Sequence, residues 1–418
     1  MTGQTNADML APYRVLDLTD KKGFLCGRIL GDLGADVIKV EPPEGDPTRN
    51  TAPFYHDIPD PEKSLYWFAY NANKRGITLD ITTQDGKELF KKLVKTCHFV
   101  IESYPPGYMD SLGLGYQDLA RTNPGIVMVS ITPFGQDGPY QGFKSCDLVT
   151  QALGGFMYVC GDPDRAPVRV SFPQAFLFAG AEGAVGALMA HYSRETTGQG
   201  QYVDVSAQQS VVTSLLEAHM FWNYVQVILK REGPLRLRPT GLRWRQVWPC
   251  KDGHVAFLLM TGPSWAAHDQ RLARLVDGEG MASASFKKID WATWDFETAS
   301  QEDYDRVIEP IYSFFQSHTK QEIYDMAVKH DLIVLPLSDP SDLVDDSQLK
   351  ARGFWVEVYH PELEEAIKYP GAFFQASEAS GRIRRRAPLI GEHNREIYEQ
   401  ELGISPEQMV VLKQAHVI

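Results

Sequence analysis

The stretch Tyr13–Val40, YRVLDLTDKKGFLCGRILGDLGADVIKV, decides the fold class. Two apolar runs, Tyr13–Leu18 and Ala35–Val40, have the length and composition of buried strands, and a helical run, Leu25–Leu33, lies between them. One glycine precedes the helical run and another follows it. Strand, glycine turn, helix, glycine and strand is the order of a βαβ unit, which places its two strands parallel in one sheet.

The same alternation continues downstream. Gly76–Ile81 and Phe99–Glu102 are predicted strands that flank an amphipathic helix over Gln84–Thr96, and Ile126–Ile131 is predicted as one more strand. Strands that alternate with helices in this way are typical of a doubly wound domain. We therefore predict an α/β fold with a Rossmann-like large domain.

The composition changes twice beyond this region, near residues 230 and 335. Residues 153–192 are rich in Gly and Ala, which favours closely packed helices, and residues 207–230 are predicted as one long apolar helical segment. A predicted strand over Gly253–Leu259 and several amphipathic helices follow, which is typical of an α+β domain. We predict a large domain over 1–230, a smaller α+β domain over 231–335, and a return to the large domain over 336–418.

Composition excludes several classes of function. The 418 residues carry a formal net charge of −13, which argues against a nucleic-acid partner. No run approaches the roughly 20 apolar residues that span a bilayer. The start, MTGQTNADMLAPYRV, has no basic residues followed by an apolar segment, so we expect no signal peptide. The five cysteines are scattered singly, which predicts reduced thiols in a cytoplasmic protein and no metal site.

Common catalytic motifs are absent from the sequence. It contains no GxxxxGKS/T, no HExxH and no GxSxG, and none of its 11 histidines pairs with another at metal-ligand spacing. Gly113 and Gly115 match part of a dinucleotide-binding loop, but the third glycine is missing. These motifs therefore leave the reaction undefined.

Longer blocks are more informative, and they follow one another along nearly the whole chain. They include VLDLTDKKGFLCGRILGDLGADVIKVE, ESYPPG, DLVTQALGG, TTGQGQYVDVS and RAPLIGEHNREIYEQELGIS. In this order and combination the chain resembles the family III CoA-transferases, the group that contains formyl-CoA and carnitine CoA-transferases. The matching blocks cover residues 15–49, 71–107, 112–140, 147–155, 196–210, 248–257 and 386–405.

The resemblance implies an assembly and a reaction. Two chains are expected to form an interlocked-ring dimer, in which each chain runs from the large domain into the small domain and back. The substrates are CoA thioesters, and no cofactor is expected to be tightly bound. An aspartate attacks the thioester and forms an enzyme-bound mixed anhydride, and hydrogen-bond donors stabilise the oxyanion that develops at each step.

This sequence departs from the family at the nucleophile. The resemblance places the aspartate about twenty residues before the TG-x-GQ block and four residues ahead of a glycine. Counted from Thr197 and from Gly180, the position is Phe176. A phenylalanine side chain has no nucleophilic atom, so it cannot attack a thioester. The simplest function of Phe176 is packing.

Two other acids are candidate substitutes for the missing aspartate. Glu182 would lie nearly two helical turns beyond Phe176. Asp147 stands where the resemblance places a supporting acid, and it also suits the cap of a helix that begins at Leu148. The sequence leaves these alternatives open.

The CoA-binding pattern is retained only in part. The arginines that the resemblance places after VIKVE and within GYMDSLG are Pro42 and Ser111 here, and a bulky basic segment replaces the glycine run of formyl-CoA transferases. Lys74 and Arg75 also suit a solvated position before a strand. The residues that we predict to contact CoA are Asn73, Lys74, Arg75, Ser103, Tyr104, Pro105 and Lys144.

Together the departures predict a CoA-transferase subunit that is inactive alone and acts with a homologous catalytic chain, as a heterodimer or heterotetramer. Within the family the chain most resembles the subunits of heteromeric enzymes that activate arylsuccinates, so we predict transfer of CoA from succinyl-CoA to a carboxylic acid such as benzylsuccinate. Two alternatives stay open. One is a self-sufficient transferase or acyl-CoA racemase that uses Glu182 or Asp147, and the other is a non-enzymatic acyl-CoA-binding protein.

Overall fold

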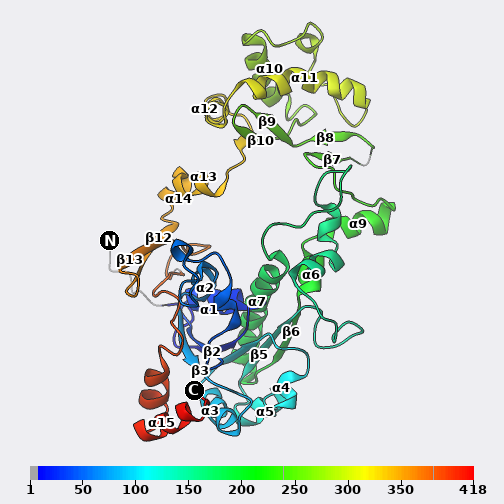
Figure 1. Ribbon diagram of the computed structural model, residues 1–418. Helices are drawn as coiled ribbons and strands as arrows, with labels where there is room; N and C mark the ends of the chain where they lie inside the picture. Colours follow the sequence, from blue (N-terminus) through cyan, green and yellow to red (C-terminus); the bar gives the residue numbers. More distant parts are fainter. Residues whose placement is uncertain (1–7, 239, 380) are drawn as a thin grey trace. The chain divides into compact units, whose positions relative to one another are not determined.

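The computed structural model describes residues 8–238, 240–379 and 381–418 (Figure 1). The N-terminal segment for which we predict no signal peptide includes residues 1–7, which lie outside the described residues. None of the described helices combines the length and the apolar composition that a bilayer crossing requires.

Two compact units make up the described chain. The first contains the described residues up to Gly155, Ser171–Ser214 and Ser347–Ile418, and the second contains Phe156–Val170 and Leu215–Asp346. The boundaries predicted near residues 230 and 335 both fall inside the second unit. The chain thus leaves the first unit twice and returns to it twice.

A six-stranded parallel sheet, in the order β3-β2-β1-β4-β5-β6, forms the centre of the first unit. This arrangement confirms the predicted α/β fold. The order reverses between β1 and β4, so the loops after these strands diverge at the carboxyl edge, where ligands bind in such sheets. The strands are β1 (Arg14–Leu18), β2 (Asp36–Glu41), β3 (Lys74–Thr78), β4 (Phe99–Glu102), β5 (Val127–Thr132) and β6 (Tyr202–Ser206).

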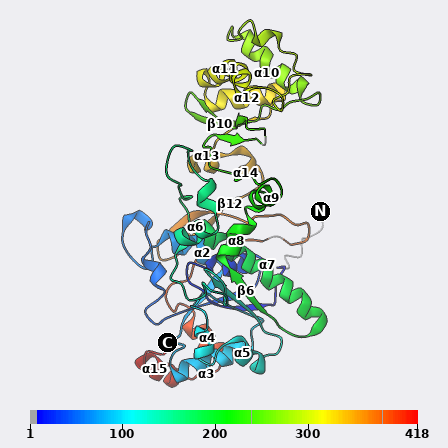
Figure 2. The same cartoon turned by 90° about the vertical axis from the view of Figure 1, so that its right-hand side faces the viewer.

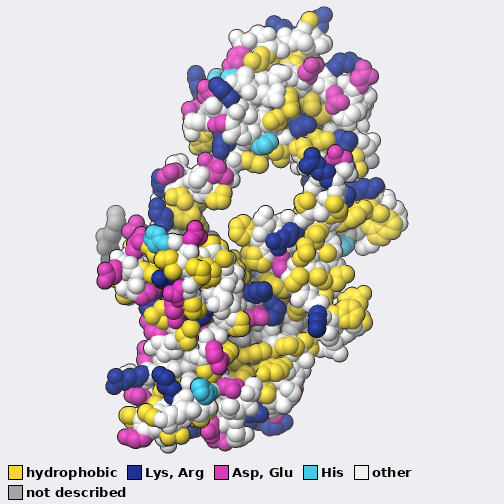
Figure 3. Space-filling view, viewed as in Figure 1, with side chains coloured by type: hydrophobic (Ala, Val, Ile, Leu, Met, Phe, Trp, Pro, Cys, Tyr) yellow, Lys and Arg dark blue, Asp and Glu magenta, His cyan; other side chains and the backbone are white. Residues whose placement is uncertain are grey.

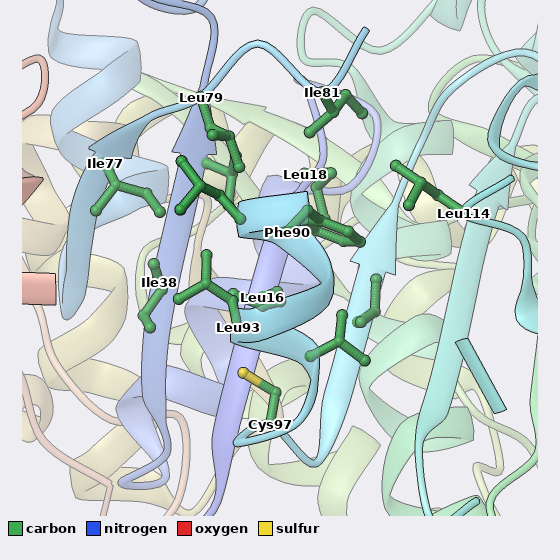
Figure 4. Packing of buried hydrophobic residues seen from close by; sticks show 14 of the residues in the cluster. Leu16, Leu18, Ile38, Ile77, Leu79, Ile81, Phe90, Leu93, Cys97 and Leu114 are labelled. Carbon is green, nitrogen blue, oxygen red and sulfur yellow. The ribbon is translucent and has the colours of Figure 1, made fainter. Parts of the chain in front are cut away.

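Helices cover both faces of the sheet and bury an apolar cluster on each (Figures 1 and 2). One cluster joins α3 and α5 to side chains such as Leu16, Leu18 and Ile38 (Figure 4). The other cluster joins α1 and α7 to the strand residues that alternate with those of the first cluster and project from the opposite face of the sheet. The helices of this unit are α1 (Phe24–Asp32), α2 (Leu65–Asn71), α3 (Gln84–Val94), α4 (Tyr108–Ser111), α5 (Tyr116–Thr122), α6 (Asp147–Leu153), α7 (Gln174–Thr197), α8 (Ala207–Thr213), α14 (Ser347–Ala351) and α15 (Pro406–Gln414).

The C-terminal stretch of the first unit adds a hairpin, β12 (Trp355–His360) with β13 (Glu365–Pro370), and a π-helix over Arg395–Glu401. Short 3₁₀ helices occur at Pro47–Asn50 and Tyr55–Asp57.

The second unit has an α+β composition around an aromatic core. An antiparallel sheet, β11-β10-β9, and a two-stranded pair, β7-β8, provide its strands. Its elements are the 3₁₀ turns Phe156–Val159 and Phe286–Lys288, α9 (Leu216–Val225), β7 (Leu235–Leu237), β8 (Arg243–Arg245), β9 (Val247–Cys250), β10 (Gly253–Phe257), α10 (Ala266–Gly278), α11 (Gln301–Ser317), α12 (Lys320–His330), β11 (Val334–Pro336) and α13 (Pro340–Asp345).

One helix prediction is wrong. Residues 207–230 form two helices, α8 and α9, instead of one, and α9 ends at Val225. The hydroxyl of Ser214 donates to the Val211 carbonyl at the end of α8, and such a side-chain bond competes with the helical backbone.

Candidate active site

A cavity of about 910 Å³ lies at the carboxyl edge of the central sheet. It is lined mainly by the loop and helix after β4 and by the loop after β5, which is the edge at which α/β sheets bind ligands. Hydrophobic side chains lie at the surface near β5 and β6 (Figure 3). The lining residues include four that were predicted to contact CoA, namely Ser103, Tyr104, Pro105 and Lys144.

The loop after β4 is held in place by two sets of hydrogen bonds. The Ser103 hydroxyl accepts from the Asp20 amide at 2.8 Å and donates to the Asp20 carboxylate at 2.9 Å. The Tyr104 amide donates to the Glu102 carboxylate at 2.7 Å. Ser103 therefore connects the cavity wall to the loop after β1.

The charges at the cavity are mixed. The lining residues include two basic side chains, Lys22 and Lys144, and two acidic ones, Glu102 and Asp110. The Lys22 ammonium pairs with the Asp20 carboxylate. Lys22 and Glu102 lie within the blocks VLDLTDKKGF and ESYPPG, but the resemblance gives neither residue a role, so neither was predicted.

Glu102 is the most deeply buried of these charged groups, with 3% of its surface exposed. Burial raises the pKa of its carboxyl from 4.5 to about 7, although bonds from Ser130 and the Tyr104 amide favour the charged form. A protonated carboxyl can thus exist inside this cavity near neutral pH.

We expect Glu102 to make the stability of the protein depend on pH. Between pH 4.5 and 7 the folded chain retains a proton that the unfolded chain loses, so this group lowers stability as the pH rises. Above pH 7 the loss reaches at most about 3 kcal/mol. Glu102→Gln removes this term. Urea unfolding of the wild type and the variant at pH 5 and pH 8 would measure this. We expect the variant to have a higher free energy of unfolding than the wild type at pH 8 only, and an equal increase at both pH values would contradict a raised pKa of Glu102.

The other predicted CoA residues, Asn73, Lys74 and Arg75, lie elsewhere. They are at the start of β3, level with the start of β2, and hence at the amino edge of the sheet. The strand begins at Lys74 and not at Gly76, and all three residues are buried. The alternative that Lys74 and Arg75 are solvated before a strand is therefore wrong.

Both charged side chains of this group have protein partners. The Lys74 ammonium donates to the Asp17 carboxylate at 2.7 Å, to the Asn71 amide oxygen at 2.9 Å and to the Phe24 carbonyl at 3.0 Å. Its three hydrogens are thus used inside the domain. Arg75 pairs with Asp36 and with two glutamates of the C-terminal π-helix. Asn73, Lys74 and Arg75 therefore lie outside the cavity that the other predicted CoA residues line.

Phe176 lies in the first turn of α7 and is 3% exposed. It belongs to the apolar cluster between α1, α7 and the sheet. Gly180 allows the close approach of these two helices, because a Cβ there would lie 2.9 Å from the Leu25 Cβ. The phenyl ring therefore packs in the interior at the position that the resemblance assigns to the nucleophile.

Asp147 does not cap the helix in which it lies. It is the first residue of α6, whose N-cap position is Cys146. Its carboxylate instead accepts from the amides of Ala175 and Phe176, at 2.9 and 3.3 Å, at the start of α7. The alternative that Asp147 caps a helix beginning at Leu148 is therefore wrong. Asp147 instead binds the free N–H groups at the positive dipole end of a different helix, α7.

Glu182 has a protein partner as well. The Ser210 hydroxyl of α8 donates to its carboxylate at 2.6 Å. This bond holds the carboxylate toward α8. Neither candidate substitute is a carboxylate directed freely into the cavity of Ser103 and Lys144, and neither is among the residues that line it.

We expect Asp147→Ala to destabilise the protein by about 2 kcal/mol, because the buried amides at the start of α7 and the amide of Gln151 lose their acceptor. Asp147→Asn keeps one acceptor oxygen and should cost less. Denaturant unfolding of the three proteins would test this, and an Ala variant as stable as the wild type would contradict it.

The parallel sheet, the cavity at its carboxyl edge and the position of Phe176 on α7 can now be compared with those of known proteins. Residues 10–394 match CoA-transferase family III. The chain therefore belongs to this family.

Particular relatives cover nearly the whole chain. It is 35% identical, over 92% of both chains, to a succinyl-CoA:(R)-benzylsuccinate CoA-transferase subunit, BbsE, from Thauera aromatica. It is 29% identical, over the full length of both chains, to the beta subunit of a succinyl-CoA–L-malate CoA-transferase from Chloroflexus aurantiacus. A CAIB/BAIF family protein from Brucella suis has a similar structure, with a TM-score of 0.79, 27% identity, and coverage of 93% of this chain and 98% of the other.

Proposed function

We propose that this chain is the subunit of a heteromeric CoA-transferase that lacks the nucleophile, and that a homologous partner chain supplies the aspartate. The observation that carries the proposal is the buried phenyl ring of Phe176 at the nucleophile position. A carboxylate must reach the thioester carbon to attack it. The two candidate substitutes, Asp147 and Glu182, are held by other parts of the protein.

In the reaction proposed for the complex, CoA is transferred through two successive anhydrides on the partner's aspartate. The partner's aspartate attacks the carbonyl carbon of succinyl-CoA, the C–S bond breaks, and CoA leaves as the thiolate. The succinyl aspartyl anhydride then exchanges succinate for the acceptor carboxylate, and the thiolate attacks the new anhydride to release the product thioester and the free aspartate. No metal and no tightly bound cofactor is required.

Surface features of the first unit support a partner chain. Val185, Met189 and Tyr192 on α7 are 60, 64 and 73% exposed, and their spacing places them on one face of the helix. Large apolar side chains grouped in this way favour a protein interface over solvent. We propose that this face contributes to the interlocked heterodimer, and that the complex works in the cytoplasm.

The substrate part of the proposal rests on similarity. The relatives from Thauera and Chloroflexus are named for transfer from succinyl-CoA, the first to (R)-benzylsuccinate and the second to L-malate. Both acceptors are dicarboxylic acids. We propose succinyl-CoA as the donor and a benzylsuccinate-like diacid as the acceptor.

The test is a set of acceptors offered to the complex. The chain would be co-purified with a homologous chain that has the aspartate, and supplied with succinyl-CoA and benzylsuccinate, L-malate, mesaconate or oxalate. We expect benzylsuccinyl-CoA to form fastest, as measured by liquid chromatography of the CoA esters. Preference for a small diacid would overturn the acceptor assignment, and full activity of the purified chain as a homodimer would overturn the function.

A further inference from the structure

Three polar side chains form a row across neighbouring strands beside the cavity. Glu102 on β4 is in register with Ser130 on β5, and Ser130 is in register with Asp204 on β6. Residues in register on parallel strands project from the same face of a sheet, so these side chains are neighbours. The proposed catalytic steps use none of them.

Hydrogen bonds through Gln136, in the loop after β5, connect the row. The Gln136 side-chain amide donates to the Ser130 hydroxyl at 2.5 Å, and its backbone amide donates to the Asp204 carboxylate at 2.9 Å. Because the Ser130 oxygen accepts from Gln136, its own hydrogen is available for the Glu102 carboxylate. Glu102 also accepts from the Tyr104 amide.

The charged and titratable groups around Glu102 give it little positive charge. Lys22, which precedes α1, attracts the carboxylate, but the Lys22 ammonium already pairs with Asp20. Asp204 repels it from β6. The other titratable groups that line the cavity are Tyr104, Tyr108 and Asp110 after β4, Tyr116 on α5, Lys144 after β5, and Tyr202 on β6.

A CoA ester brings phosphate groups, and often a carboxylate, into this environment. The ligand would cover the part of Glu102 that faces the cavity and add negative charge beside it, and both changes disfavour the charged form of the carboxyl. Among the described residues, Lys22 is the cation that attracts the Glu102 carboxylate, and its ammonium is already paired with Asp20. Uptake of a proton by Glu102 from solvent removes the repulsion between its carboxylate and the ligand, and it requires no movement of the chain.

We propose that Glu102 takes up a proton when a CoA ester enters the cavity, so that binding of the ester to this subunit is coupled to pH. The inference rests on the proposed function, since it requires that the cavity binds CoA. Glu102 is here a positioning residue, which holds the Tyr104 amide in both charge states and changes the charge of the cavity in one of them.

Proton counting by titration calorimetry tests the inference without a variant. The heteromeric complex would be titrated at pH 8 with an unreactive S-alkyl derivative of CoA, which has no thiol to ionise, in two buffers that differ in ionisation enthalpy. We expect a net uptake of up to one proton, and an affinity that rises up to about tenfold for each unit of decrease in pH between 8.5 and 7.5. This range lies above the ionisation of the CoA phosphate monoester, which falls near pH 6.

Two variants assign the proton to its residue. Glu102→Gln should bind CoA with an affinity that varies at most twofold across this range and that exceeds the wild type at pH 8.5. Asp110→Asn is the matched control, since it removes the charge of the other acid at the cavity wall, and it should keep the wild-type slope.

The possible results separate the two proposals. CoA binding by the complex without proton uptake, or with a slope that Glu102→Gln retains, would overturn this inference and leave the proposed function standing. To assign binding to this chain, Ser103 and Lys144 would be replaced together, and unchanged affinity would place the CoA on the partner alone and overturn the inference. A complex that neither binds CoA nor transfers it would overturn the proposed function, and this inference with it.

Discussion

The purified chain is expected to transfer CoA at least about a thousandfold more slowly than the same chain in complex with a homologue that has the aspartate. Removal of an enzyme nucleophile lowers turnover by several powers of ten, because no other group can take over the covalent step at a comparable rate. Phe176 occupies this position here, and its side chain is buried.

The two candidate substitutes for the nucleophile already accept hydrogen bonds from other groups of the protein. Asp147 accepts two backbone amides at the start of α7, and Glu182 accepts the Ser210 hydroxyl. To act as a nucleophile, either carboxylate would have to give up these bonds and move to the cavity, of which neither is a lining residue.

Matched variants of the complex make this prediction specific. Glu182→Gln in this chain should leave turnover within about threefold of the wild type, because the amide keeps an oxygen that accepts from Ser210. Alanine in place of the partner's aspartate should reduce turnover to the background rate. If Glu182→Gln abolished turnover of the isolated chain, the chain would be self-sufficient.

The largest expected effect on stability comes from Asp17→Asn, which should cost about 3–5 kcal/mol of the free energy of unfolding. Asp17 is fully buried on β1 and accepts from the Lys74 ammonium at 2.7 Å. A second buried ammonium, that of Lys39, lies 4.0 Å from the same carboxylate. Burial acts to raise the pKa of Asp17, but the two lysines outweigh it and hold the pKa below its ordinary value.

Loss of this charge leaves two buried ammonium groups with one fewer anion. The Lys39 ammonium also donates to the Thr19 carbonyl at 2.5 Å, and Thr19 begins the loop that leads to Lys22. We therefore expect the variant to weaken CoA binding as well as stability. Asp118→Asn is the control, since its pair with Arg121 is at the surface and should be worth less than about 1 kcal/mol.

Chemical denaturation at pH 7 measures both variants. An Asp17 variant that unfolds at the same denaturant concentration as the Asp118 variant would contradict the account of this buried network. The double variant Asp17→Leu with Lys74→Met provides a further check, because replacing both partners of a buried pair by apolar groups should recover part of the loss.

The main elements of the fold could be predicted from the sequence because their signals are local. The strands β1, β2, β4 and β5 and the helices α1 and α3 follow from apolar periodicity and from glycines at the turns. The edge strand β6 was missed, since its exposed Tyr202 and Asp204 interrupt the apolar pattern of a buried parallel strand.

The candidate site could be predicted only in part. The ESYPPG block contains Ser103–Pro105, which line the cavity together with Lys144, and counting back from the TG-x-GQ block gives the α7 position. The partners of Lys74 and Asp147 could not be predicted, because they depend on contacts between residues 57 and 28 positions apart in the sequence. The row of Glu102, Ser130 and Asp204 depends on strand register, which the spacing of residues along the chain does not define.

Trapping of the anhydride would show whether this subunit has a nucleophile. The complex would be incubated with succinyl-CoA and then with hydroxylamine, which converts an enzyme-bound anhydride into a stable hydroxamate, and both chains would be analysed by intact mass and peptide mapping. We expect a hydroxamate on the partner's aspartate and no adduct on this chain. A hydroxamate on Asp147, Glu182 or any other acid of this chain would contradict it.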